Sequence, residues 1–160
     1  MAYDKAFAYL KEKGYEDRVH VFREGETATC ALAAAALGVT EGEICKSMGF
    51  RGPDDSKAFL VLAAGDMKIN SGKFKRTLGV KASMLSPEAT ERFTNHQVGG
   101  VCPFGIGPDI EVYMDESLRK YEIVYPACGS DNTAVKLTIP ELEKLSGSRG
   151  WIDVTVPRNE

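Results

Sequence analysis

The feature that most constrains the fold of this chain is an unbroken apolar run at residues 58–63, Ala-Phe-Leu-Val-Leu-Ala. A strand with one face in water alternates apolar and polar side chains, whereas a strand covered on both faces reads as a continuous apolar run. Helix-like and strand-like segments alternate along the rest of the chain, which favours a mixed α/β or α+β domain. The sequence therefore predicts that this strand is covered on both faces.

Several segments carry the residues that begin and end helices. N-terminal caps are expected at Thr27 or Thr29, Asn70 and Ser86, while Gly38 and Gly79 have the freedom that helix C-termini require. Residues 40–43 have the spacing of a capping box and predict a short helical turn. The expected helices are residues 3–13, 30–37, 70–79, 86–95 and 140–145.

Short strand-like segments separate these helices. They are residues 18–22, 44–50, 58–63, 81–85, 111–114 and 122–125 as a pair, 135–138 and 151–156. Many short strands predict a strongly curved mixed sheet with helices packed around it.

Length and charge limit the possible functions. The 160 residues fit one domain, residues 1–160, and the longest apolar stretch, residues 31–37, is far shorter than the ~20 residues that span a bilayer. No secretory signal opens the chain, so a cytoplasmic protein without membrane contact is expected. The net charge of −3 argues against a general nucleic-acid binder.

One stretch is nevertheless basic. Residues 67–81 contain no acidic residue, and the cations there include Lys73, Lys75 and Arg76. Such a stretch is suited either to contacts with phosphates or to a solvated helix face.

The four cysteines, Cys30, Cys45, Cys102 and Cys128, fit no zinc-binding spacing. We expect them to be small buried apolar residues. A nucleophilic Cys102 activated by His96 is the alternative.

Lys46 lies among apolar neighbours in the expected strand at residues 44–50. A buried ammonium is costly unless it has a partner, so an inward-facing lysine would point to a function. Strand alternation equally allows Lys46 to point outward.

Two loops are rich in small residues. Gly99 and Gly100 lie in the first, residues 96–108, where their backbone can approach a ligand and offer N–H groups to a carbonyl oxygen or an anion. Pro103 and Phe104 add a rigid turn and an aromatic ring. Gly129 and Ser130 lie in the second loop, residues 127–132, and are also pocket candidates. Both loops are equally consistent with tight connections.

No nucleophile elbow and no zinc-hydrolase motif are present. An enzyme of this kind would depend on backbone amides, Lys46 and groups of the substrate itself. Positioning and electrostatic stabilisation are sufficient for an activated ester.

Taken in order, these features resemble the YbaK/EbsC family of prolyl-tRNA-editing-like domains. The resemblance covers residues 27–154. It is carried by residues 31–39, 44–47, 60–66, 73–81, 98–105, 112–115, 129–130 and 135–137.

The resemblance implies a mixed α/β fold around a curved, barrel-like sheet, and hydrolysis of the ester that joins an amino acid to the terminal ribose of tRNA. It implies that Lys46 holds the tRNA 3′ end, that the amides of Gly99 and Gly100 orient or polarise the ester, and that Gly129 and Ser130 complete the pocket. No metal, cofactor or protein nucleophile is implied. Misacylated tRNA is the expected partner, with a prolyl-tRNA synthetase as a second candidate.

The remaining site assignments follow from this reading. Lys73, Lys75 and Arg76 are expected to meet phosphates of the acceptor stem, and Pro103 and Phe104 to contact the substrate. Phe22 would line the pocket or fill the core. The loop at residues 129–133 lacks the basic residues expected in cysteine-specific deacylases and the histidine expected in alanine-specific ones, so a small amino acid (Ala, Ser, Thr or Cys) is the expected range. A catalytically silent binding module is the alternative function.

Overall fold

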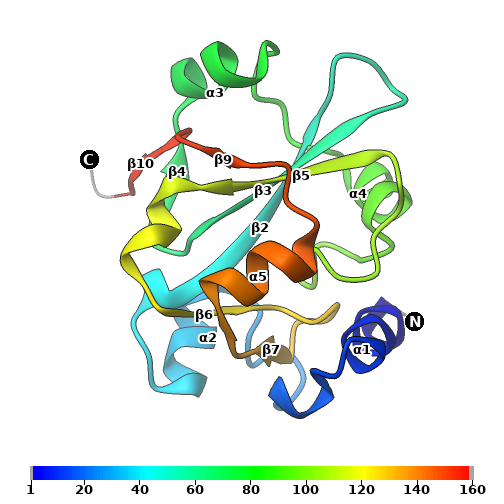
Figure 1. Ribbon diagram of the computed structural model, residues 1–160, viewed down its shortest axis with the longest axis vertical. Coiled ribbons are helices and arrows are strands. Elements are labelled where there is room, and N and C mark those ends of the chain that lie inside the picture. The colour runs from blue at the N-terminus through cyan, green and yellow to red at the C-terminus, as the bar shows by residue number, and fades with distance from the viewer. Residues whose placement is uncertain (1, 159–160) are drawn as a thin grey trace.

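A curled six-stranded sheet forms the centre of the protein (Figure 1). The computed structural model describes residues 2–158, with side chains from residue 5 onward. The strand order is β8 (Leu137–Thr138), β6 (Ile123–Pro126), β2 (Ile44–Arg51), β3 (Ala58–Ala64), β5 (Ile110–Asp115) and β9 (Trp151–Ile152). Strands β2 and β3 form an antiparallel hairpin, and β3, β5 and β9 run parallel. The predicted curved mixed sheet surrounded by helices is confirmed.

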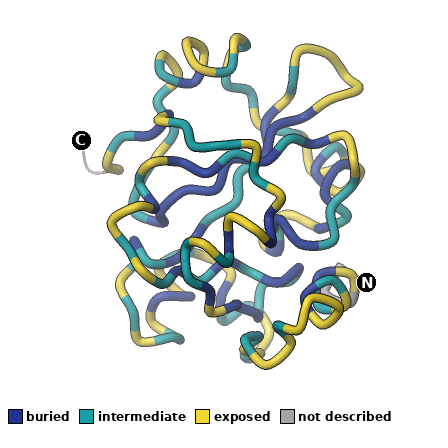
Figure 2. Tube along the Cα trace, viewed as in Figure 1, coloured by how far each residue is buried: buried dark blue, intermediate teal, exposed yellow. Residues whose placement is uncertain are grey.

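Strand β3 is buried along its whole length, as its apolar run predicts (Figure 2). Leu60 and Leu62 point into the main core, which also takes apolar side chains from α1 (Ala2–Glu12) and α5 (Ile139–Ser146). Phe59 and Val61 point the other way, into a second core that contains Phe74 of α3 (Ser71–Leu78). Because each face of β3 meets a separate apolar layer, the strand has no polar alternation.

The helices begin and end close to where their capping residues predict. Helix α2 (Cys30–Leu37) begins after Thr29, whose hydroxyl accepts a hydrogen bond from Leu32 N–H, and ends at Gly38 in the left-handed conformation. Helices α3 and α4 (Pro87–Thr94) are capped in the same way by Asn70 and Ser86. No helix within residues 2–158 has the length and apolar character needed to cross a membrane.

Two short ribbons flank the main sheet and correct the strand predictions. Strand β1 (Val19–Val21) pairs with β7 (Thr133–Val135), and β4 (Met67–Ile69), which was not predicted, pairs with β10 (Thr155–Pro157). The single strands expected at 135–138 and 151–156 are therefore each divided in two, because their halves pair with different partners. Strands β5 and β6 are present but are not neighbours in the sheet.

The strand predicted at residues 81–85 is wrong. This segment makes only one isolated bridge, between Met84 and Phe50 of β2. Two backbone hydrogen bonds join it to β2, from Arg51 N–H to the Ser83 carbonyl and from Leu85 N–H to the Gly49 carbonyl. That contact is too short to continue as a ladder, but it places Met84 on the wall of a cavity.

Candidate functional site

A cavity of about 430 Å³ lies between the start of α2, the first half of β2 and the glycine-rich loop at residues 96–108. Its walls are mainly apolar and small. They include Thr27, Cys30, Ala33, Lys46, Gly99 and Ala134. A cavity with a few polar groups in a largely apolar wall is the usual form of a small-molecule site.

Lys46 is turned into this cavity wall and is half-buried. Its ammonium donates a hydrogen bond to the carbonyl of Met67, at the start of β4. Burial lowers the pKa of Lys46, while the neighbouring Cys30 thiol acts in the opposite direction. The inward orientation, which alternation left open, is the one that the structure adopts, and the ammonium is partly desolvated beside an apolar space.

Gly99 lines the same cavity and has a φ of 99°, a backbone conformation that residues with a side chain rarely adopt. Among the hydrogen bonds of residues 2–158, none has the Gly99 N–H as donor. Gly99 is exposed, so this N–H is available to an oxygen atom of a ligand. The arrangement is suited to stabilising a negative charge that develops on a carbonyl oxygen.

The N–H of Gly100, unlike that of Gly99, already has a hydrogen-bond partner. It donates to the Gln97 carbonyl at 3.0 Å, so this amide is already engaged within the loop. A Cβ atom at Gly100 would lie 2.5 Å from Ser130 N and 2.6 Å from the Gly129 carbonyl. The two small-residue loops are therefore in direct backbone contact, and Gly100 is required for that contact by its size.

The second loop is held by its own hydrogen bonds. Ser130 Oγ lies 2.6 Å from Asn132 Oδ1 and 3.1 Å from Thr133 Oγ1. Asn132 in turn donates its side-chain amide to the Phe22 carbonyl at 3.1 Å, and its backbone carbonyl accepts from Phe22 N–H at 2.7 Å. Phe22 is half-buried and is not among the residues that line the cavity around Lys46; its backbone fixes the loop.

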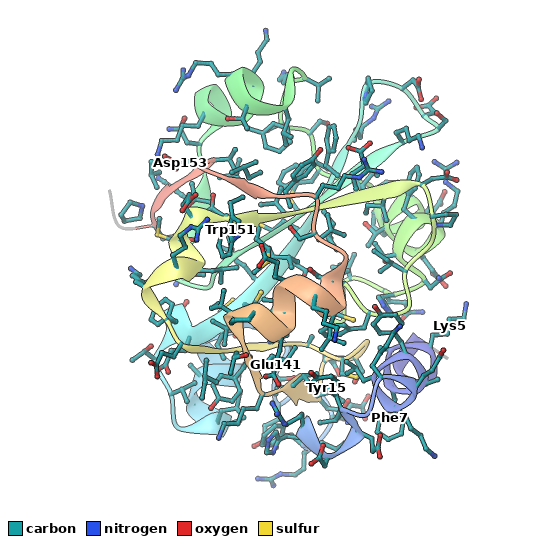
Figure 3. The ribbon with its side chains drawn as sticks, in the orientation of Figure 1. Lys5, Phe7, Tyr15, Glu141, Trp151 and Asp153 are labelled. Carbon is teal, nitrogen blue, oxygen red and sulfur yellow. The ribbon has the colours of Figure 1, made fainter. Side chains whose placement is uncertain are left out.

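Gly129 and Ser130 open onto a second hollow, of about 560 Å³, on the other side of the glycine loop. Its wall is polar and contains three carboxylates, from Glu24, Glu91 and Asp131, with Lys5 of α1 as its cation (labelled in Figure 3). Val98 lies on the walls of both spaces and is 68% exposed. The glycine loop thus divides an apolar cavity from an acidic hollow.

Pro103 and Phe104 lie in the interior. Both are buried, and the ring of Phe104 stacks on Tyr9 with centroids 6.3 Å apart. Neither residue lines the cavity or the hollow. The stacking of Phe104 on Tyr9 joins the glycine-rich loop to α1, away from the cavity that Lys46 lines.

Cys102 and His96 are adjacent, with the sulfur 3.3 Å from Nε2, but both side chains are fully buried. His96 Nε2 also lies 2.6 Å from the Phe104 carbonyl. A carbonyl only accepts hydrogen bonds, so Nε2 carries the proton and has no lone pair for the thiol. Burial raises the pKa of Cys102 and lowers the pKa of His96, which keeps both groups neutral. The pair therefore lacks both the thiolate and the access that a nucleophile needs.

The basic residues of α3 lie away from the cavity. Lys73 forms an ion pair at 3.0 Å with Asp153, which is labelled in Figure 3, and also donates to the Thr155 carbonyl at 3.0 Å. Lys75 and Arg76 line a separate shallow depression. In Figure 1, α3 is at the top of the molecule, whereas α2 and β7, which border the cavity, are at the bottom.

Other cavity residues were not selected from the sequence as site candidates. Ser47 Oγ is buried without a hydrogen-bond partner within residues 5–158, and Ser47 lines the cavity. Met84, 64% exposed, lies at the cavity wall within residues 81–85, the segment for which the strand prediction is wrong. Their positions depend on how distant segments meet, and neither carries a local sequence signal.

Comparisons with known proteins identify the group to which this chain is similar. The family model of the aminoacyl-tRNA editing domain matches residues 24–145. The uncharacterized protein YwhH of Bacillus subtilis (strain 168) is 49% identical over 131 residues, covering 82% of this chain and 83% of that protein. A proline–tRNA ligase of Geobacillus thermodenitrificans is 31% identical over 114 residues, covering 71% of this chain but only 19% of the ligase.

Solved structures agree with this assignment. One presented as a proposed trans-editing enzyme for prolyl tRNA synthetase superposes with a TM-score of 0.86 at 29% identity, covering 97% of both chains. The fold and family expected from the residue pattern are therefore confirmed.

Proposed function

Because the chain belongs to the aminoacyl-tRNA editing domain family, we propose that it hydrolyses the ester bond between a wrongly attached amino acid and the 3′ end of a tRNA. The observation that carries this proposal is the meeting of two groups at one apolar cavity: the half-buried ammonium of Lys46 and the unpartnered N–H of Gly99. The first suits an anionic or hydroxyl-rich tRNA end, and the second suits an ester carbonyl.

The proposed reaction uses water as the nucleophile. Water adds to the ester carbonyl carbon, and the Gly99 N–H stabilises the resulting oxyanion. The bond to the ribose oxygen then breaks, and that oxygen leaves with the proton that the water gives up. Lys46 holds the tRNA end so that the ester lies over the glycine loop. An aminoacyl ester is already activated, so positioning and one or two donors supply a useful rate.

A thiol mechanism is disfavoured by the burial of Cys102 and the engaged Nε2 of His96. We expect Cys102→Ala to retain the rate of hydrolysis while lowering the free energy of unfolding by roughly 1 to 2 kcal/mol, because it leaves a small void in the core. Loss of hydrolysis in a folded Cys102→Ala protein, judged by circular dichroism, would restore the nucleophile hypothesis.

The proposed substrates carry a small amino acid: Ala, Ser, Thr or Cys. The small residues of the cavity wall support this range. Binding alone discriminates poorly between similar small side chains, and a second hydrolytic step corrects the resulting errors. Proline tRNA is the proposed carrier, supported by the similarity to part of a proline–tRNA ligase. A prolyl-tRNA synthetase is the proposed partner, and the cytoplasm the proposed location.

The test is deacylation of tRNAs charged with Ala, Ser, Thr, Cys or Pro by the wild type and by Lys46→Ala. Hydrolysis of one or two species, lost in the variant, is the expected result. If the wild type hydrolyses none of them yet binds the aminoacylated 3′ end, the chain is a binding module and the proposed enzyme activity is wrong.

A further inference from the structure

The 3′ end of a tRNA is a single strand that must leave the cavity on one side, and two hollows adjoin the cavity. One is the acidic hollow beyond Val98, with carboxylates from Glu24, Glu91 and Asp131. The other is a groove of about 370 Å³ that shares Met84 and Leu85 with the cavity. The two exits differ in charge, which makes them distinguishable for a polyanion.

The groove beyond Met84 is lined by cations from three separate parts of the chain. Arg51 comes from the end of β2, Lys57 from the turn before β3, and Arg92 from α4. Asp54 and Asp55 are the carboxylates of the same wall, so cations exceed anions there, whereas the hollow beyond Val98 has the opposite balance. We propose that this groove, defined by Arg51, Lys57 and Arg92, carries the phosphodiester backbone of the nucleotides next to the aminoacylated end. The proposal rests on the proposed function.

The cations of the groove are available to phosphates. Arg51 is paired with Asp55 at 3.2 Å, but both side chains are largely exposed, at 62% and 89%. Exposed ion pairs are weak, and a guanidinium binds a phosphate through two parallel hydrogen bonds. Lys57 lies 3.8 Å from Asp109 in another half-exposed pair. Exchange of these partners for a phosphate therefore costs little.

The groove also offers a surface for a base. Met84 is 64% exposed and stands between the cavity and the groove. A flexible thioether can pack against the flat ring of any base, whatever the nucleotide sequence. Such a surface suits sequence-independent binding of a single strand, in which cations contact the phosphates and a few side chains pack against the bases.

The experiment compares two charge-matched variants. Arg51→Gln/Arg92→Gln removes two cations of the groove. Lys144→Gln/Arg149→Gln removes two exposed cations that line none of the three spaces. Each is assayed on an aminoacylated acceptor-stem minihelix and on an aminoacyl ester of adenosine, which has no phosphate.

For the groove variant we expect KM for the minihelix to rise roughly tenfold with kcat unchanged, and hydrolysis of the adenosine ester to stay at the wild-type rate. The slope of log KM against log salt should fall by about 0.7 for each phosphate that the variant no longer neutralises. Equal minihelix KM values for the groove and control variants would overturn the proposal. Arg92 also donates to the Asp55 carbonyl at 3.2 Å, so Arg51→Gln/Lys57→Gln replaces the first variant if it unfolds.

Failure of the proposed function gives a different result. If the wild type hydrolyses neither substrate, the groove can still be tested by measuring the binding of a minihelix that carries no amino acid. Weaker binding by the groove variant than by the control supports the groove, and equal binding overturns it.

Discussion

The protein carries two basic surfaces of different origin. The α3 surface, Lys75, Arg76 and Lys81, comes from neighbouring residues in the chain and lines its own shallow depression. The groove, Arg51, Lys57 and Arg92, is assembled from three distant segments and shares walls with the cavity. Charge density along a sequence reveals the first kind of surface and misses the second. The distance of each basic surface from the cavity depends on the fold, and local sequence composition does not reveal it.

The largest difference in activity is expected between replacement of the cavity lysine, Lys46, and replacement of Lys73 on α3. Lys46→Ala removes the half-buried ammonium of the cavity, and we expect kcat/KM for deacylation to fall roughly a hundredfold, as for removal of a positioned donor. Lys73→Ala on α3 breaks the ion pair with Asp153 and should change kcat/KM less than about twofold. Single-turnover deacylation measures both. A comparable fall in kcat/KM for Lys73→Ala would mean that α3 also contacts the tRNA substrate.

Glycine replacements give the next largest contrast. A Cβ at Gly100 would meet the backbone of Gly129 and Ser130, so Gly100→Ala should separate the two loops and lower kcat/KM about tenfold or more. Gly79 ends α3 with a φ of 80° and open space around it. Gly79→Ala should cost about 1 to 2 kcal/mol of unfolding free energy, from backbone strain alone, without a change in kcat/KM.

Thermal unfolding and deacylation of the same samples separate these effects. If Gly100→Ala lost stability but kept full activity, the loop contact would be structural and would not shape the site.

These contrasts follow the limits of sequence reasoning. Helix α2 has the predicted bounds, and Thr29 rather than Thr27 caps it, because capping residues act on their own local backbone. The sequence predicts a strand at 81–85, but a strand needs a partner, and this segment makes a single bridge to β2. The direction of Lys46 was open, since alternation does not say which face holds the cavity. Phe104 looked like a ligand contact, but its loop turns it onto Tyr9.

The pH dependence of ligand binding tests whether the charge of Lys46 contributes to that binding. Burial lowers the pKa of this side chain in the folded protein, so its charge is lost at a lower pH than in the unfolded chain. Binding of an amide-linked, non-hydrolysable aminoacyl minihelix should therefore weaken several-fold as the pH rises through the folded-state pKa. Lys46→Arg, whose guanidinium stays charged, should bind independently of pH over the same range.

Stability should respond to the same titration with the opposite sign. Between the folded-state and the unfolded-state pKa of Lys46, the unfolded chain binds the extra proton, so the Lys46 contribution to stability rises with pH. Opposite trends in binding and unfolding, both absent in Lys46→Arg, are the expected signature. Parallel trends would assign the pH effect to another group.

The smallest effect is expected on the α3 surface, where the sequence placed its phosphate contacts. Lys75→Gln/Arg76→Gln removes two exposed cations that line neither the cavity nor the groove. We expect KM for the aminoacylated minihelix to change less than about twofold and its salt slope to stay at the wild-type value, because each phosphate left without its cation would lower that slope by about 0.7. A full-length tRNA is the sharper substrate, since it extends beyond a minihelix. An effect confined to the full-length tRNA would mean that α3 binds a distant part of the tRNA, and the two basic surfaces would then divide one ligand between them.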